Sequence, residues 1–198
     1  VGQDVVTDVP WSSVEEHFEE ITSAADSVSI FSSLAGPNAS QVWLKSRTDA
    51  ELPYAGKPDF FGGTAAAEPM HPLPGISAVN CSQQMGVAGP WSDRLSHFRL
   101  AFTPSNGDEL QSEYLMDRRF AVQGIEILRA MAGEIAPLIQ VCEIRTMAGD
   151  DLWLSTNYGP DSVAFHFTWK PLQADAEALL ARMEAALAPL QPRPHWGK

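Results

Sequence analysis

The sequence has few basic residues and few cysteines, and each shortage excludes a class of function. The 13 Lys and Arg residues are outnumbered by 25 Asp and Glu residues, which gives a formal net charge of −12. An acidic surface without a Lys/Arg cluster repels a phosphate backbone, so nucleic acid is not an expected partner. The 2 cysteines, Cys81 and Cys142, lie in dissimilar contexts. We therefore expect no disulfide framework, and a reducing cytoplasm is the expected location.

Long apolar runs and phosphate-binding motifs are also missing. No apolar run approaches the roughly 18 residues needed to cross a bilayer, and the N-terminus has no basic segment before an apolar one, so no membrane partner is expected. Gly62-Gly63-Thr64 is too short to cradle a phosphate and lies among prolines. No metal site is expected either. Because Val1 is not an initiator Met and Lys198 directly follows a polar motif, we interpret the chain as part of a longer protein.

The first half of the chain predicts a β-α-β-β order. A chain of 198 residues that is 44% hydrophobic can bury one core, as one domain or two closely fused subdomains. Apolar side chains at spacings of three and four predict an amphipathic helix over 10–25. They are Trp11, Val14, Phe18 and Ile21. Strands are predicted at Asp4–Val9, Ser27–Ser32 and Gln41–Lys45.

Residues 49–91 predict a long loop region, because Pro, Gly, Ala and Ser replace any periodic pattern. Long loops in compact domains are usually functional or disordered. A lid or an interface is one interpretation, and a plain flexible insertion is equally compatible with the composition. We expect this region to be the most mobile internal part of the chain.

The second half repeats the pattern of the first. It predicts a strand over 97–102, a turn over 104–107, a strand over 113–116, a helix over 120–131, strands over 138–146 and 163–169, and a helix over 174–190. The predicted fold class is α+β: a large, mainly antiparallel sheet built from two β-α-β-β-like halves and covered on one face by helices. The other face is then free to hold a ligand.

Two of these strands carry polar side chains on one face. Because alternate side chains share a face, Glu143 and Arg145 project together from the first strand, as do His166 and Thr168 from the second. If the strands are neighbours, the four groups form one polar floor. Such a floor suits a polyhydroxylated ligand, since each hydroxyl group needs a donor and an acceptor.

Structural explanations compete for each of these residues. Glu143 and Arg145 are compatible with an ordinary ion pair on a solvated sheet surface. Their identities alone favour this structural explanation over a functional site by about two to one. His166 taken alone is more often a hydrogen-bonded sheet residue than a catalyst, and Thr168 is a common strand residue. In the terminal segment, Trp196 can serve as an anchor and Gly197 can simply permit a turn. The joint occurrence of these residues is what favours a site.

The terminal motif Arg193-Pro194-His195-Trp196-Gly197-Lys198, read with Glu143-Ile144-Arg145-Thr146 and His166-Phe167-Thr168-Trp169, resembles a known family. In order and spacing these segments resemble the C-terminal substrate domain of alditol (xylitol) oxidases. These are flavin enzymes of the vanillyl-alcohol-oxidase type. The similarity covers nearly all of residues 1–198, and the His-Trp-Gly-Lys part is shared with the wider sugar-lactone oxidases.

The resemblance implies roles for particular residues. Glu143, Arg145, Thr168 and Lys198 match positions that line the substrate pocket, and His166 matches a position beside them. Arg145, His166 and Lys198 are the expected catalytic groups. His195 and Trp196 are expected near the flavin.

The resemblance also implies the reaction and its cofactor. The expected activity is oxidation of the C1 hydroxyl of a polyol such as xylitol or sorbitol to the aldose, with release of hydrogen peroxide. FAD would be held by an FAD-binding domain of the same protein, outside this chain, so the chain alone is expected to lack flavin and activity. Two alternatives stay open: an aldonolactone oxidase of the same superfamily and a non-catalytic sugar-binding module.

Overall fold

The computed structural model describes residues 1–49, 59–95 and 109–198, and the chain divides into two compact units. The first unit comprises Val1–Phe31 and Pro37–Gly107, and the second comprises Ser32–Gly36 and Asp108–Lys198. Named strands pair antiparallel within each unit and helices pack against them, so the predicted α+β class is confirmed. The predicted strand over 97–102 and turn over 104–107 lie outside the described residues.

The first unit contains an antiparallel sheet with strand order β4-β5-β1-β3-β2. Its elements are β1 (Gly2–Pro10), α1 (Trp11–Glu16), α2 (Phe18–Thr22), β2 (Ser27–Ser32), β3 (Asn38–Ser46), β4 (Asp59–Phe60), β5 (Gly63–Ala65), the 3-10 turn η1 (Ala78–Asn80) and α3 (Trp91–Arg94). The three strands predicted for this half are confirmed, although β1 and β3 extend beyond the predicted bounds.

The helix predicted over 10–25 is two short helices that are separated at His17. This residue has φ −119° and ψ 29°, which ends α1 before α2 begins. The apolar spacing persists across the break, because Val14 and Phe18 are four residues apart and both are buried. Trp11 and Ile21 are buried as well, so the predicted core face is confirmed.

The Pro/Gly-rich region contains regular structure that the composition did not predict. Phe60 pairs with Gly63, and Phe61 and Gly62 between them have φ values of 51° and 85°. Two consecutive residues with positive φ are typical of the tight turn of a β-hairpin. A Cβ atom at Gly63 would lie 2.6 Å from Cγ2 of Val9 and 2.7 Å from Cγ1 of Val6. The absent side chain therefore allows β5 to approach β1.

The second unit contains an antiparallel sheet with strand order β7-β8-β6-β9. Its elements are β6 (Leu110–Asp117), the 3-10 turn η3 (Arg118–Phe120), α4 (Ala121–Ala130), α5 (Ala132–Ile135), β7 (Ile139–Met147), β8 (Ser162–Trp169), α6 (Gln173–Leu187), the 3-10 turn η4 (Ala188–Leu190) and β9 (Arg193–Pro194). The strands predicted over 138–146 and 163–169 and the two predicted helices are confirmed with small shifts of their ends.

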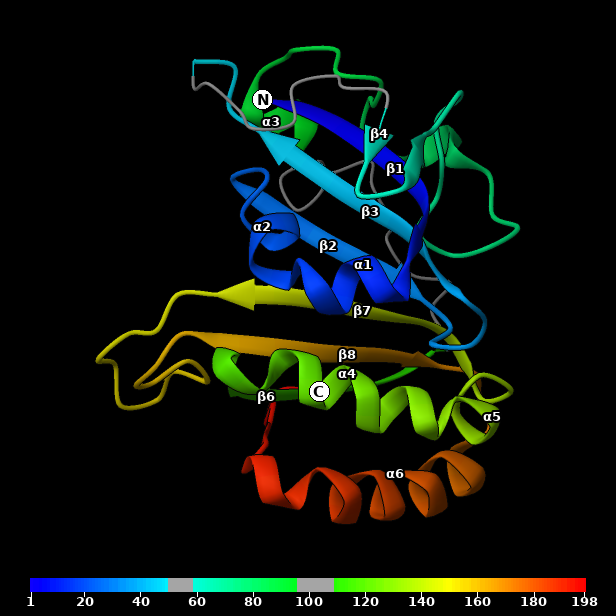
Figure 1. Ribbon diagram of the computed structural model, residues 1–198, viewed down its shortest axis with the longest axis vertical. Coiled ribbons are helices and arrows are strands. Elements are labelled where there is room, and N and C mark those ends of the chain that lie inside the picture. Colours follow the sequence, from blue (N-terminus) through cyan, green and yellow to red (C-terminus); the bar gives the residue numbers. More distant parts are fainter. Residues whose placement is uncertain (50–58, 96–108) are drawn as a thin grey trace. The chain divides into compact units, whose positions relative to one another are not determined.

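The two units share one topology. In the first, β1 and β2 both pair with β3, and in the second, β6 and β7 both pair with β8. In each unit, the last strand of a β-α-β-β motif lies between the other two strands in the sheet (Figure 1). The recurrence inferred from the sequence is confirmed at the level of strand order.

One face of the second sheet packs against helices. Phe165 and Phe167 of β8 are fully buried on this face. Figure 1 shows α4 running along the strands of this unit, and a Cβ atom at Gly124 of α4 would lie 3.0 Å from the Phe165 ring. The hydroxyl group of Tyr114 on β6 donates to Glu184 of α6 at 2.7 Å. Because this face is filled, polar groups of the strands are left to the opposite face. Across the described ranges, no helix has the length and apolar character needed to span a membrane.

The β4–β5 hairpin gives a test with a matched control. We expect Gly63→Ala to lower the melting temperature, because the new methyl group must displace Val6, Val9 or the carbonyl of Thr7. Gly133→Ala is the control, since no atom lies within 4 Å of its added Cβ and alanine favours a helix by about 0.5–1 kcal/mol over glycine. The melting temperatures of the two variants, measured by circular dichroism, should therefore shift in opposite directions from that of the wild type. Equal effects of the two substitutions would contradict the proposed close contact.

Candidate functional site

A row of three ionisable side chains crosses the second sheet on the face opposite the helices. Glu143 of β7 pairs with His166 of β8, and His166 pairs in turn with Glu113 of β6. In the same register Thr168 lies opposite Val141, and Arg145 lies opposite Ala164. Strand alternation therefore brings the four predicted residues Glu143, Arg145, His166 and Thr168 onto one face, as the sequence predicted.

Arg145 connects the two carboxylates of this row. Its guanidinium group donates to Oε1 of Glu113 at 2.8 Å and lies 3.7 Å from Oε2 of Glu143. The same Oε2 atom of Glu143 is 3.4 Å from Nδ1 of His166. The Glu113 side chain is only 2% exposed, so it requires charged partners to remain ionised.

The C-terminal segment brings a second cation to the row. β9 pairs with β6, and the backbone N–H of His195 donates to the carbonyl of Glu113 at 2.8 Å. This pairing carries the chain back so that Nζ of Lys198 lies 3.0 Å from Oε2 of Glu113. Glu113 thus binds the C-terminal segment through its backbone and the Lys198 ammonium through its side chain.

The charges of the cluster shift the pKa values of its members. Burial alone would raise the pKa of Glu113, but hydrogen bonds and charge interactions with Arg145 and Lys198 outweigh it and hold the pKa below its usual range. Burial alone would lower the pKa of Arg145, whereas Glu143 and Glu113 raise it. The carboxylate of Glu113 and the guanidinium of Arg145 are therefore both ionised at neutral pH.

His166 has one free ring nitrogen. Its Nδ1 atom faces Glu143, whereas its Nε2 atom is buried and has no hydrogen-bond partner among the residues that the structure describes. A buried polar atom without a partner is uncommon in a folded protein and is often satisfied by a ligand or a water molecule. Nε of Arg145 is likewise buried without a described hydrogen-bond partner, so these two nitrogen atoms of the cluster are available to an added hydroxyl group.

His195 and Trp196 lie beside the cluster and not within it. Nδ1 of His195 accepts a hydrogen bond from the backbone N–H of Gly197 at 3.1 Å, so this ring nitrogen is used locally. The Trp196 side chain is 79% exposed. Its indole ring is available to another molecule or domain.

Glu113 is the member of the cluster that sequence reasoning did not select. The sequence around Glu113 does not mark it as a site residue, because it reads as an ordinary alternating strand. That Glu113 shares a face with His166 could have been inferred only from the register between β6 and β8. The same register places the exposed Gln111 beside Thr168, which adds an amide to the polar face.

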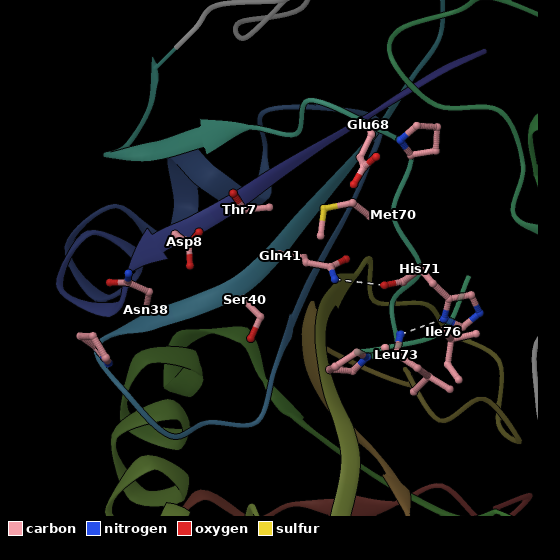
Figure 2. Close-up of a pocket in the computed structure, with 14 residues that line it drawn as sticks. Thr7, Asp8, Asn38, Ser40, Gln41, Glu68, Met70, His71, Leu73 and Ile76 are labelled. Carbon is pink, nitrogen blue, oxygen red and sulfur yellow. Dashed lines mark hydrogen bonds between the residues drawn. The ribbon is translucent and has the colours of Figure 1, made fainter. Parts of the chain in front are cut away.

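A separate pocket of about 670 Å³ lies in the first unit, where the predicted loop region meets β1 and β3. Figure 2 shows the side chain of Gln41 directed toward His71, whose backbone carbonyl accepts from it at 3.0 Å. Nδ1 of His71 accepts from the backbone N–H of Leu73. Burial lowers the pKa of His71, and this hydrogen bond only partly opposes the effect, so the imidazole is neutral at pH 7. Asp8 and Glu68 are the charged residues of the described lining, which makes the pocket unsuitable for an anion.

Comparison with known proteins supports the resemblance seen in the sequence. The chain is 47% identical, over 201 aligned positions, to an alditol oxidase from a Streptomyces species. The chain is homologous to part of an alditol oxidase. The match covers the whole of this chain and 46% of that relative, so the chain spans about half the relative's length. No protein-family model matches the chain.

The described ranges contain no group of three or more His, Cys, Asp or Glu residues arranged to hold a metal ion. Both cysteines are free thiols, and burial raises the pKa of the Cys142 thiol well above its usual value. The polar cluster on β6, β7, β8 and the C-terminal segment is therefore the best candidate site of the second unit.

The buried carboxylate predicts a specific dependence of stability on acid. Since the pKa of folded Glu113 is below that of an unfolded glutamate, about 4.3, its ionised form stabilises the fold above that pH, and the contribution disappears as the pH falls through the folded value. Arg145, Glu143, His166 and Lys198 face it. We expect the difference in urea midpoint between the wild type and Glu113→Gln to be constant from pH 7 to about pH 5 and to shrink below pH 4.3.

The control for this measurement is Glu134→Gln. Glu134 forms a pair with Arg182 in which both side chains are 55% exposed, and such pairs contribute little to stability. The Glu134→Gln midpoint should follow the wild type at every pH. A wild-type to Glu113→Gln difference that does not change between pH 7 and pH 3 would contradict the assignment.

Proposed function

We propose that this chain is the substrate-binding part of an FAD-dependent alditol oxidase that oxidises the C1 hydroxyl of a polyol, such as xylitol or sorbitol, to the aldose. The observation that carries the proposal is the convergence of Glu143, Arg145, His166 and Lys198 on one sheet face of a chain that is 47% identical to an alditol oxidase. The sequence alone also predicts each of these residues as part of the site.

The residues of the chain fit the substrate side of a flavin site better than the phosphate side. The net charge of −12 and the lack of a phosphate-cradling loop do not suit the pyrophosphate of FAD. The unpartnered Nε2 atom of His166 and the exposed ring of Trp196 suit a substrate hydroxyl and an aromatic ring system, respectively. When bound by an FAD-binding domain of the same protein, FAD would supply the hydride acceptor and the route of electrons to dioxygen, which yields hydrogen peroxide.

Arg145 and Lys198 are the groups that orient and stabilise the reacting oxygen. Both cations approach the same carboxylate of Glu113, Arg145 at 2.8 Å and Lys198 at 3.0 Å. Negative charge develops on the C1 oxygen as its proton leaves. Preorganised cations in a site of low polarity stabilise such charge more effectively than mobile water does. Arg145 supplies a planar fork and Lys198 a point charge.

His166 is the proposed proton acceptor. A proton on Nδ1 directed toward Glu143 at 3.4 Å leaves the lone pair on Nε2, which has no other described partner. Glu143 thereby orients the ring and stabilises the imidazolium that forms when Nε2 takes the proton of the C1 hydroxyl. The neutral imidazole is the reactive form, and the cations hold the oxygen from which the proton departs.

Glu143 and Thr168 are the proposed contacts of the remaining hydroxyl groups. Both face the site, Thr168 is 7% exposed, and together they offer acceptor and donor capacity to neighbouring hydroxyls. A substrate that lacks one of these hydroxyls would leave a buried polar group unpaired, which penalises simple alcohols relative to polyols.

A loop of the second unit is the proposed contact surface for the FAD-binding domain. Leu152, Trp153 and Leu154 are 64%, 89% and 85% exposed, which is unusual for large apolar residues in sequence. The loop is attached to the C-terminal segment, because Arg193 donates to the carbonyl of Tyr158 at 2.8 Å. A domain that covers this loop would therefore also lie near β9, which carries Arg193.

The direct test uses the full-length protein that contains this chain, loaded with FAD. We expect xylitol and sorbitol to produce hydrogen peroxide, and simple primary alcohols to react much more slowly. Preferential turnover of aldonolactones would support the lactone oxidase alternative, and binding of polyols without turnover would support the non-catalytic alternative.

A matched pair of lysine substitutions tests the role of the C-terminal cation. We expect Lys198→Met to lower kcat about 100-fold at saturating polyol, comparable to the loss of one oxyanion-stabilising donor. Lys170→Met is the control, because Nζ of Lys170 donates to the Pro137 carbonyl, outside the cluster. Turnover is normalised to bound flavin. If Lys198→Met lowers only the melting temperature and leaves turnover per flavin unchanged, Lys198 is a structural residue.

A further inference from the structure

We propose that the pocket of the first unit is a second binding site, which takes a small hydroxylated amine such as an amino sugar. The pocket has a volume of about 670 Å³, which is in the range of small-molecule sites, and all of its described lining belongs to one compact unit. The proposed oxidation of polyols does not use this pocket, so the inference is independent of that function.

Several polar side chains of the lining have hydrogen-bonding capacity that the described part of the chain does not use. Four of them make no hydrogen bond or ion pair there: Asp8, Asn38, Ser40 and Glu68. Gln41 is 5% exposed, and its amide donates one N–H to the backbone carbonyl of His71, so its second N–H has no described partner. Two carboxylates, two amides and a hydroxyl group therefore border the same cavity and can meet a ligand.

The backbone of β1 directs Asp8 to this cavity. Strand alternation would place Thr7 and Asp8 on opposite faces of the sheet, yet both line the pocket (Figure 2). Asp8 has φ 59°, whereas β1 pairs with β3 both at Thr7 and at Val9. Val6 and Val9, which are three residues apart, are both fully buried. The left-handed residue thus brings a carboxylate to the pocket and leaves the core on either side of it filled.

The loop that completes the pocket is held by buried side chains. Gln84 is 1% exposed, accepts from the backbone N–H of Met70 at 2.9 Å and donates to its carbonyl at 2.7 Å. Oε1 of Gln41 accepts from the indole N–H of Trp43 at 2.6 Å, which fixes the amide that reaches His71. A preformed pocket loses little conformational freedom when a ligand binds, so the cavity is suited to specific binding.

The lining as a whole selects the class of ligand. Asp8 and Glu68 contribute carboxylates, and the described lining contains no Lys or Arg, so an ammonium group is favoured over an anion. Asn38 and Ser40 supply an amide and a hydroxyl group, which suit the hydroxyl groups of a ligand. Leu73 and its neighbouring prolines offer apolar contact to C–H groups. An amino sugar combines these three properties.

The experiment compares D-glucosamine with D-glucose, which has the same ring and lacks the amine. Titration calorimetry is carried out under anaerobic conditions on the FAD-loaded full-length protein, at about pH 6.5, where the amine is protonated. We expect glucosamine to bind at least about 10-fold more tightly than glucose. Its affinity should fall about 10-fold in Asp8→Asn and in Glu68→Gln, because each substitution removes one carboxylate from the lining.

Two substitutions of Asp8 separate binding from folding. Asparagine adopts left-handed backbone readily, and glycine does so without strain, so neither Asp8→Asn nor Asp8→Gly should lower the melting temperature. Both should weaken glucosamine binding to the same extent. Since Asp8 lies outside the polar cluster of the second unit, kcat for a polyol should stay unchanged in both variants.

Two control variants locate the ligand. Lys198→Met alters the polar cluster of the second unit, and Glu134→Gln alters an exposed pair with Arg182. Glucosamine affinity should match that of the wild type in both. Binding is measured without turnover, so a failure of the proposed oxidation would leave this test intact.

Several outcomes would overturn the proposal. Equal affinity for the two sugars, or binding of neither, would do so in the wild type alone. Unchanged glucosamine affinity in Asp8→Asn or in Glu68→Gln would show that the amine does not meet these carboxylates. A loss in Lys198→Met would place the sugar in the polar cluster instead. A Lys or Arg side chain from the rest of the full-length protein, seated between Asp8 and Glu68, would identify the pocket as a contact between domains.

Discussion

The structure of the candidate site depends on one buried carboxylate. Glu113 connects a strand, a cation from the neighbouring part of the sheet and the C-terminal end of the chain, through its backbone and both side-chain oxygens. A buried charge with a single partner is costly, whereas one that lies between two cations is compensated. One buried carboxylate therefore holds Arg145 and Lys198 on the same face of the sheet.

The two-faced sheet makes this arrangement possible. One face of β8 is filled by Phe165, Phe167 and the helices that pack on them, so the opposite face is free to carry His166 and Thr168. These groups come from regular strands, whereas Lys198 comes from the turn that follows β9. A site on strands is held more firmly than one on loops, which suits a reaction that requires a fixed distance between a hydroxyl group and its proton acceptor.

Much of this site could be predicted because it follows from period-two alternation within strands. The shared face of Glu143 and Arg145 required only the local sequence, and the motif that ends in Lys198 was informative through its resemblance to a family. Glu113 could not be predicted, because its role depends on the register between β6 and β8 and on the return of β9. The β4–β5 hairpin was missed because a Pro/Gly-rich composition hides a two-residue turn at Phe61 and Gly62. The break at His17 was missed because the apolar spacing continues through it.

We propose that a polyol binds the cluster built around Glu113. A crystal structure of the FAD-loaded full-length protein with xylitol tests it most directly. We expect a terminal hydroxyl of xylitol within hydrogen-bond distance of Arg145, Lys198 and Nε2 of His166, with further hydroxyls at Glu143 and Thr168. Xylitol bound instead in the pocket beside Gln41 and His71, with the cluster around Glu113 unchanged and filled by water, would contradict it.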